Sequence, residues 1–232
     1  MLSKESNKRG LQKGFTMLEL MVSMAILSIV GAVIVSGLTS LVQRNTMETS
    51  KIDLTQESRQ FMDQIVSDIH QSGYPSAKMF DLASLVPPTN AAAINCAIYV
   101  QISCGFVNAT PSSLQFEADV DGSGTVSEVF IQLNPLNGPC PCIIQRGTVP
   151  KAQFIAGNLP VYFTEVNNVT NTNIFLGYDN AGNNVPLVGA VPANSNLAAI
   201  EITLNVQSSV PDSNGLFPTI TMSTGAKIHN FN

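Results

Sequence analysis

One segment constrains this chain more than any other: residues 20–42 form a run of 23 residues without a charge or a proline. At about 1.5 Å per residue, a helix of that length crosses the roughly 30 Å hydrocarbon layer of a bilayer. A secretory signal peptide would have a shorter apolar run that ends at a small-residue cleavage site. We therefore expect residues 15–42 to span a membrane, and a buried core helix of a soluble protein is the alternative that hydropathy alone leaves open.

Charge is distributed unevenly around this segment. Residues 1–14 carry four basic residues against one acidic residue, a net charge of +3, and the remaining chain carries seven against fifteen, a net charge of −8. Because basic flanks stay on the cytoplasmic side, the C-terminal bulk is expected to be exported. Nucleic-acid binding needs basic surface, so the acidic balance of the exported part predicts no nucleic-acid partner.

Glu19 is the one charge within residues 15–42. A carboxylate inside an apolar span costs about 2.5–3.5 kcal/mol on insertion scales, and such groups are usually paired and functional. Cleavage after Gly14 would create an α-amino group on Phe15, four residues before Glu19. The two charges can then neutralise each other within one chain or between neighbouring chains. The alternative is a Glu19 side chain that reaches back to the lipid headgroups.

The sequence Lys13-Gly14-Phe15-Thr16-Met17-Leu18-Glu19, after a short basic leader and before a long apolar run, resembles the prepilin signature of type IV pilins and type II secretion pseudopilins. The resemblance implies that residues 1–14 are a leader, which the prepilin peptidase/N-methyltransferase removes between Gly14 and Phe15, and that Phe15 is then N-methylated. It also implies that Glu19 pairs with the N-terminal amine of a neighbouring subunit during assembly. It covers about the first 40 residues, and therefore indicates the superfamily without the member.

The helix is expected to continue beyond the apolar span, over about residues 16–72. Its second half, residues 43–74, is polar but keeps apolar residues largely at three- and four-residue steps, which predicts an amphipathic helix packed on the chain's own C-terminal domain. These residues are Leu54, Phe61, Met62, Ile65, Val66 and Ile69. Gly73-Tyr74-Pro75 predicts the end of the helix. The stretch from Ser58 to Tyr74 is similar to the helix end of W-type (PilW-like) minor pilins.

Residues 75–232 are expected to form one β-rich head, and their 158 residues suffice for a hydrophobic core. The clearest strand is Ile200–Val206, where apolar and polar residues alternate strictly. Further strands are expected at Ile98–Ser103, Ser113–Ala118, Glu128–Leu133, Val161–Thr164, Ile174–Tyr178 and Thr219–Ser223, and long loops at 76–95 and 207–216. No helical pattern alternates with these strands. The predicted fold class is therefore α+β, with the long N-terminal helix packed on an antiparallel sheet.

Four cysteines agree with export to an oxidising compartment, where one or two disulfides are expected. Cys96 and Cys104 can bridge across a local hairpin, whereas a bridge from Cys140 to Cys142 would close a very small, strained ring. Three pairings are open, so pairing between the two clusters remains an alternative. The spacing of neither pair resembles a zinc site.

The stretch from Asp119 to Glu128 resembles the start of a calcium loop. The side-chain oxygens of Asp119, Asp121, Ser123 and Glu128 and the backbone carbonyl of Thr125 are the candidate ligands. The acid stands at the tenth position instead of the twelfth, and strands flank the loop. The alternative is a Gly-rich β-hairpin with exposed acids and no cofactor. The same stretch is similar to a sheet segment of W-type minor pilins and J-type minor pseudopilins.

Together with the apolar span and the flanking charges, these resemblances imply a minor pilin, a single-pass inner-membrane protein with a cytoplasmic N-terminus and a periplasmic head, which then enters a type IV pilus-like filament. Its expected partners are other pilin or pseudopilin subunits, the peptidase and the inner membrane. A J-type minor pseudopilin of a type II secretion system is the alternative. A membrane-anchored exported enzyme or binding protein has less support, since no Gly-x-Ser-x-Gly motif, phosphate loop or Ser/His/Asp set is present, and no catalytic residue is predicted.

Overall fold

The computed structural model divides into two compact units, residues 1–46 and 47–232, which we describe separately. The predicted leader, apart from Gly14, and most of the predicted loop 76–95 lie outside the described residues. The structure describes residues 14–80, 96–135, 139–191, 196–212 and 214–229.

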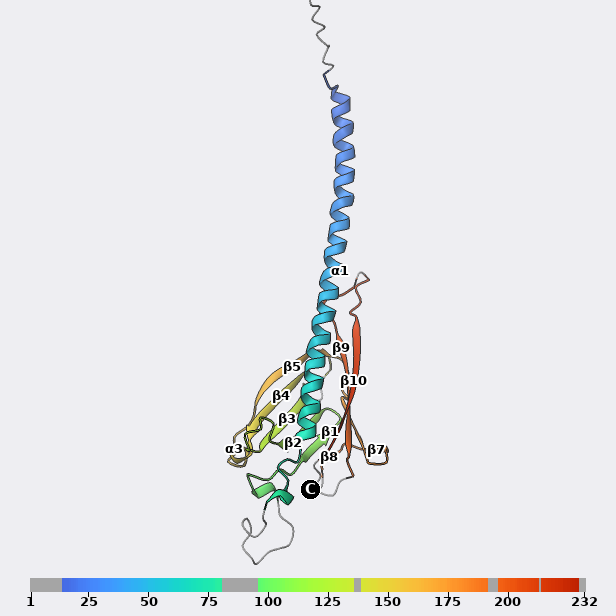
Figure 1. The fold of residues 1–232 in the computed structure, drawn as a ribbon. Coiled ribbons are helices and arrows are strands. Elements are labelled where there is room, and N and C mark those ends of the chain that lie inside the picture. Colours follow the sequence, from blue (N-terminus) through green and yellow to red (C-terminus); the bar gives the residue numbers. More distant parts are fainter. Residues whose placement is uncertain (1–13, 81–95, 136–138, 192–195, 213, 230–232) are drawn as a thin grey trace, which may run out of the picture. The chain divides into compact units, whose positions relative to one another are not determined.

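Helix α1 (Met17–Gln71) is a single helix of 55 residues, which confirms the predicted helix to within one residue at each end (Figure 1). Gly73, with φ at 80°, follows its last turn, and a left-handed residue of this kind commonly ends a helix. Every residue between Met17 and Thr46 is exposed except Gly31, which is partly buried. Among the described residues, α1 alone is long and apolar enough to cross a membrane.

The second part of α1, residues 47–71, buries one stripe of side chains. They recur at three- and four-residue steps, as expected for one face of a helix. The buried residues are Leu54, Ser58, Phe61, Met62, Ile65, Asp68 and Ile69. The predicted apolar positions belong to this stripe, with Val66 partly buried beside it. Ser58 and Asp68 are polar members that the pattern of apolar residues does not reveal.

The rest of this unit is a ten-stranded sheet in which every pairing between described strands is antiparallel. The strand order is β7-β6-β9-β5-β4-β3-β2-β1-β8, and β10 pairs with β9. The strands are β1 (Phe106–Thr110), β2 (Ser113–Ala118), β3 (Ser127–Asn134), β4 (Cys142–Pro150), β5 (Val161–Val169), β6 (Phe175–Tyr178), β7 (Asn184–Val185), β8 (Gly189–Ala190), β9 (Ala199–Gln207) and β10 (Thr219–Lys227). The described residues also form the short helices η1 (Ala77–Met79), η2 (Cys96–Ile98) and α3 (Lys151–Ile155).

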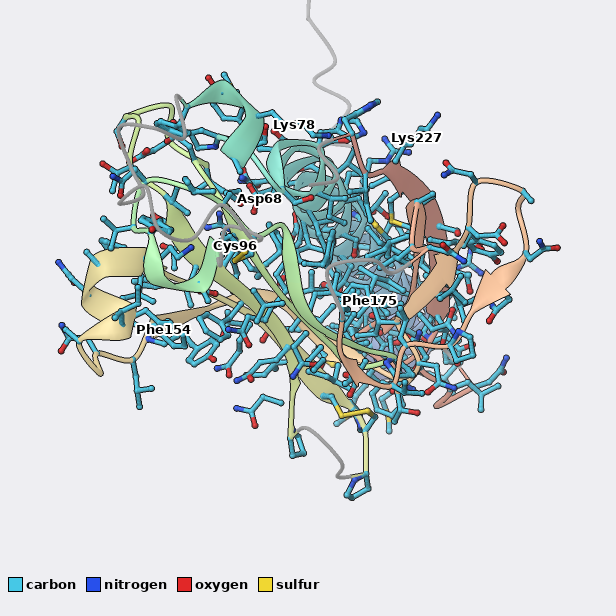
Figure 2. The ribbon with its side chains drawn as sticks, turned by 90° about the horizontal axis from the view of Figure 1, so that it is seen from below. Asp68, Lys78, Cys96, Phe154, Phe175 and Lys227 are labelled. Carbon is cyan, nitrogen blue, oxygen red and sulfur yellow. A yellow bond between two sulfur atoms is a disulfide. The ribbon has the colours of Figure 1, made fainter. Side chains whose placement is uncertain are left out.

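The two ends of the strand order, β7 and β8, are separated by only three residues in the chain. The sheet is therefore curled, so that its edge strands β7 and β8 lie close enough to be joined by one short segment. Its concave side packs on the buried stripe of α1, and one core cluster contains side chains of both. Figure 2 looks along the helix. It shows that Asp68 of α1 lies on the side of the helix toward Cys96, and that Lys227 lies on the other side. The α+β fold class is thus confirmed.

Most predicted strands are present, and Ile200–Val206 lies within β9, whose residues alternate between buried and partly buried along its length. The sequence reasoning missed β1, β4, the two-residue strands β7 and β8, and the short helices η1, η2 and α3. The strand predicted at Ile98–Ser103 is wrong, since this segment holds the end of η2 and a turn. A disulfide from Cys96 to Cys104 closes the segment into a loop, which prevents it from extending as a strand.

Candidate functional site

The start of α1 is closed by a reciprocal pair of side chains. Glu19 Oε2 accepts hydrogen bonds from the backbone N–H of Thr16 at 3.0 Å and from the Thr16 hydroxyl at 3.1 Å. The backbone N–H of Glu19 donates to Thr16 Oγ1 at 3.3 Å. This is a capping box, in which Ser or Thr precedes the helix and Glu stands three residues later. Glu19 therefore satisfies a backbone donor at the helix start, a role that its Thr-x-x-Glu spacing could have predicted.

Gly14 and Phe15 precede α1 in a short stretch without helix or strand. Both are exposed, Phe15 to 87%. A Cβ added at Gly14 would meet nothing within 4 Å, so packing within the described part of the chain does not require a glycine there. The peptide bond between the two residues is accessible, as a processing site needs to be.

The helix that follows has no polar face. Large apolar side chains are exposed at successive positions all round it, a pattern typical of a helix whose surroundings are apolar on every side. They include Met17, Leu18, Leu20, Met21, Val22, Met24, Ile26, Leu27, Ile29, Val30, Val33, Ile34, Val35, Leu38, Leu41 and Val42. Gly31 and Gly37 each cost up to about 1 kcal/mol of helix stability relative to Ala. A Cβ at either would meet nothing within 4 Å, so close packing within the described chain does not explain them.

The head contains a buried cluster of charged groups that the sequence reasoning missed. Lys151 Nζ donates to Glu117 Oε2 and to the carbonyl oxygens of Cys96 and Ile102, each at 2.7 Å. Lys151 is 1% exposed and Glu117 2% exposed. The backbone N–H of Cys104 also donates to Glu117 Oε2, at 2.6 Å. All three ammonium protons therefore have acceptors, and the cluster holds the loop 96–104 against β2.

Glu128 belongs to this cluster. It lies directly opposite Glu117 in the pairing of β2 with β3 and is 3% exposed. Burial, together with the hydrogen bond and the charge of the neighbouring Glu117, raises the pKa of Glu128 to about 8, although Gln115 and Lys151 act in the opposite direction. Glu128 is therefore mainly protonated at neutral pH, and the pair shares one negative charge opposite one ammonium.

A second ion pair ties α1 to the sheet. Arg146 Nε on β4 donates to Asp68 Oδ2 at 2.8 Å, and Gln64 Nε2 donates to Asp68 Oδ1 at 2.8 Å. Asp68 is 1% exposed, and this burial raises the pKa of its carboxyl while the Arg146 charge lowers it. Asp68 and Arg146 are 78 positions apart, so spacing along the chain does not indicate that they meet.

Both disulfides are local. Cys96 is bonded to Cys104 and Cys140 to Cys142, with Cα atoms 5.3 Å and 4.5 Å apart. Pairing between the clusters would be impossible because they lie at opposite ends of β4. Cys142 begins this strand, and Lys151, just past its end, places Nζ 4.0 Å from Cys104 Sγ. Nine strand residues at about 3.3 Å each span roughly 30 Å.

The candidate calcium ligands are only partly brought together. Asp119, Asp121, Ser123 and Thr125 share the loop between β2 and β3. There the backbone N–H groups of Gly124, Ser123 and Thr125 donate to the side chains of Asp119, Asp121 and Ser123, respectively. Glu128 does not join them, because its side chain is in the buried cluster with Gln115 and Glu117. Among the residues that the structure describes, no three His, Cys, Asp or Glu side chains gather around a metal position.

One comparison with known proteins is informative. A family model described as the prokaryotic N-terminal methylation motif matches residues 9–35, a stretch that contains Gly14, Phe15 and Glu19. No curated protein and no solved structure matches the chain. The N-terminus therefore carries the prepilin signature shared by type IV pilins and pseudopilins. This signature implies a type IV pilin-like or pseudopilin precursor, which is a structural subunit with a single apolar anchor.

Proposed function

We propose that the protein is a minor pilin, a structural subunit of a type IV pilus-like filament. Residues 15–42 hold it in the inner membrane, with the basic N-terminus in the cytoplasm and the head in the periplasm, until it is assembled. The prepilin peptidase cuts between Gly14 and Phe15 and methylates the new amine of Phe15. The observation that carries the proposal is the helix surface that is apolar on all sides and begins directly at the methylation motif.

Assembly exchanges lipid around this helix for helices of other subunits. Lipid tails are as apolar as leucine side chains, so the exchange has little hydrophobic driving force and depends on close packing and polar pairs. Gly31 and Gly37, which have open space around them, would let a neighbouring helix approach closely. The loss of helix propensity at these positions would then be offset in the filament.

Glu19 supplies the polar pair. Both hydrogen bonds from Thr16 reach Oε2, so Oε1 can accept from the α-ammonium of Phe15 of a neighbouring subunit. The amide N–H of Thr16 is unchanged by cleavage after Gly14, and the capping box therefore persists in the mature chain. Surrounded by apolar side chains, two opposite charges attract each other more strongly than in water.

A pseudopilin would use the same N-terminal physics. We favour a pilin because the segment from Ser58 to Tyr74, with its Gly-Tyr turn at the end of α1, is similar to W-type minor pilins. Cross-linking in cells followed by identification of the attached subunits separates the two functions. Pilus subunits are expected, and subunits of a secretion system would assign the protein to the J-type instead.

Three variants test the assembly role of Glu19. Glu19→Gln keeps the capping box, in which Glu or Gln serves equally, and removes the charge. Glu19→Ala removes both, and Thr16→Ala removes the cap while it leaves the charge. We expect leader cleavage and membrane insertion in all three variants. Incorporation into sheared filaments should fall at least about tenfold, equivalent to 1.4 kcal/mol, for both Glu19 variants and stay close to wild type for Thr16→Ala.

The Gln variant decides the question. If Glu19→Gln enters filaments normally while Glu19→Ala does not, the residue acts as a helix cap and the charge pair is refuted. Failure of all three variants to be cleaved would instead place Glu19 and Thr16 in recognition by the peptidase.

A further inference from the structure

The loop between β2 and β3 contains a buried carboxylate oxygen that has no partner. Asp119 follows directly after β2 and is 6% exposed. Its Oδ1 atom is inaccessible to solvent and makes no hydrogen bond. A buried charged group without a partner is costly, and such groups normally pair or bind a metal ion. A cation bound at Asp119 Oδ1 would supply the partner that this atom lacks.

The carboxylate of Asp119 points across its own loop. The backbone N–H of Gly124 donates to Asp119 Oδ2 at 2.9 Å, which orients the group toward the residues five positions further on. The φ angle of Gly124 is 80°, a conformation that favours glycine and lets the chain turn around the carboxylate. The unpartnered Oδ1 belongs to the carboxylate that this hydrogen bond fixes to the loop.

Other oxygen-bearing side chains line the same turn. Asp121 Oδ1 accepts the backbone N–H of Ser123 at 3.0 Å, and Ser123 Oγ accepts that of Thr125 at 3.3 Å. The side chains of Asp121 and Ser123 therefore lie on the same turn as the buried Asp119 Oδ1, and oxygen atoms of this kind are the ligands that calcium takes.

A second acidic turn in the chain, at Asp179, provides a comparison for the turn at Asp119. Asp179 Oδ1 accepts the backbone N–H groups of Ala181 and Asn183, and Asp179 Oδ2 accepts Asn183 Nδ2. Both of its carboxylate oxygens have protein partners. The turn at Asp119 has the same kind of hydrogen bonds, but one of its buried carboxylate oxygens, Oδ1, has no hydrogen-bond partner.

We propose that the loop Asp119–Thr125 binds one calcium ion through Asp119 Oδ1, the second carboxylate oxygen of Asp121, Ser123 Oγ and the carbonyl oxygen of Thr125. Calcium takes six to eight oxygen ligands in flexible geometry, so water completes the shell. Glu128 is held in the buried cluster and contributes no ligand. With only two carboxylates, the site belongs with the weak extracellular calcium sites, whose Kd is about 10⁻⁴–10⁻³ M.

The position of the loop gives the ion a structural consequence. Asp119 donates its backbone N–H to the carbonyl of Tyr74 at 3.1 Å, and Gly73 donates to the carbonyl of Glu117 at 3.0 Å. The loop therefore adjoins the end of α1. Two further side-chain oxygens buried without a partner, on Gln71 and Ser72, belong to that end. A bound ion would fix the connection between α1 and the sheet, and the head should melt at a higher temperature.

The test is calorimetric titration of the full-length protein in detergent with calcium chloride, and thermal melting in 10 mM calcium chloride against excess chelator. We expect one site with a millimolar or submillimolar Kd and a rise in Tm of roughly 3–11 °C for a chain of this size. Asp119→Asn should weaken binding at least tenfold. Asp179→Asn, at the turn whose oxygens are already paired, should leave binding unchanged. Magnesium chloride at the same concentration should bind more weakly, because magnesium demands stricter geometry.

Two results would overturn the proposal: no heat and no Tm shift in the wild type at 10 mM calcium, or equal binding by Asp119→Asn and the wild type. If Asp119→Asn does not fold, Asp121→Asn replaces it, since Asp121 is exposed and lies outside the core. Undiminished calcium binding by that variant would equally contradict the site. The site depends only on this loop, so it stands or fails separately from the proposed role in filaments.

Discussion

The two parts of helix α1 bury their apolar side chains in different ways. Between Leu20 and Val42 the helix is uncharged and apolar all round, and every residue from Met17 to Thr46 except Gly31 is exposed. Between Met47 and Gln71 it is apolar along one stripe, which the curled sheet of the same chain covers. The difference teaches that the second part buries its apolar side chains within its own chain, whereas the first exposes them to its surroundings. Under the proposed function these surroundings are first lipid and then other subunits.

The largest effect on the head should come from its buried ion pair. Lys151→Met removes the ammonium and leaves the carboxylate of Glu117 buried without a cation, which costs about 3–5 kcal/mol. We expect the free energy of unfolding, measured with denaturant on the full-length protein in detergent, to fall by that amount. Leader cleavage should be unchanged. Adding Glu117→Gln to Lys151→Met should restore most of the loss, because no charge is then left unpaired. Unaltered unfolding of the single variant would mean that the pair does not stabilise the head.

A matched pair of substitutions tests the comparison between the two parts of α1. Ile65 is 1% exposed and Ile29 is 67% exposed on the same helix. Ile65→Ala should lower the free energy of unfolding by about 2–5 kcal/mol, since it opens a cavity in the core. Ile29→Ala should change it by less than about 0.5 kcal/mol and should instead reduce incorporation into filaments. Equal losses of head stability from both variants would show that residues 17–46 also contribute to the core.

The smallest effect concerns pH. The folded-state pKa of Glu128 is about 8, above its ordinary value of 4.5, so the folded chain binds more protons than the unfolded chain between these values. The stabilisation is complete below about pH 4.5 and is lost as the pH rises through 8. Between pH 7 and pH 8 the free energy of unfolding should fall by about 1 kcal/mol.

Glu128→Gln keeps the shape of the protonated acid and cannot ionise. The free energy of unfolding of the variant should therefore not fall by this amount of about 1 kcal/mol between pH 7 and pH 8. An identical decrease in the variant and the wild type would place the titration on another group.

The sequence predicted the elements whose side chains follow a strict period. The three- and four-residue spacing of Met62, Ile65 and Ile69 revealed the buried stripe of α1, and the alternation over Ile200–Val206 revealed β9. Strand β4 has bulges near Ile144 and buries residues irregularly, so no two-residue period marks it. Periodicity predicts an element only where one face is buried uniformly.

The buried charges could not be predicted for a different reason. Lys151 and Arg146 look like surface residues in the sequence, but Lys151 is buried and Arg146 partly buried, and each pairs with a carboxylate 34 or 78 positions away. Lys151 also holds the carbonyls of Cys96 and Ile102, which explains why the apolar segment between them is a loop. By contrast, Gly14, Phe15 and Glu19 were recognisable because their motif is contiguous. The capping role of Glu19 was also visible in its spacing from Thr16.

The most direct test of the account is intact mass spectrometry of the protein recovered from sheared filaments. The account predicts a chain that begins at Phe15, carries one added methyl group at its N-terminus and retains the apolar helix. Recovery of a chain with residues 1–14 still attached, or of a head from which residues 15–42 have been cleaved, would contradict it.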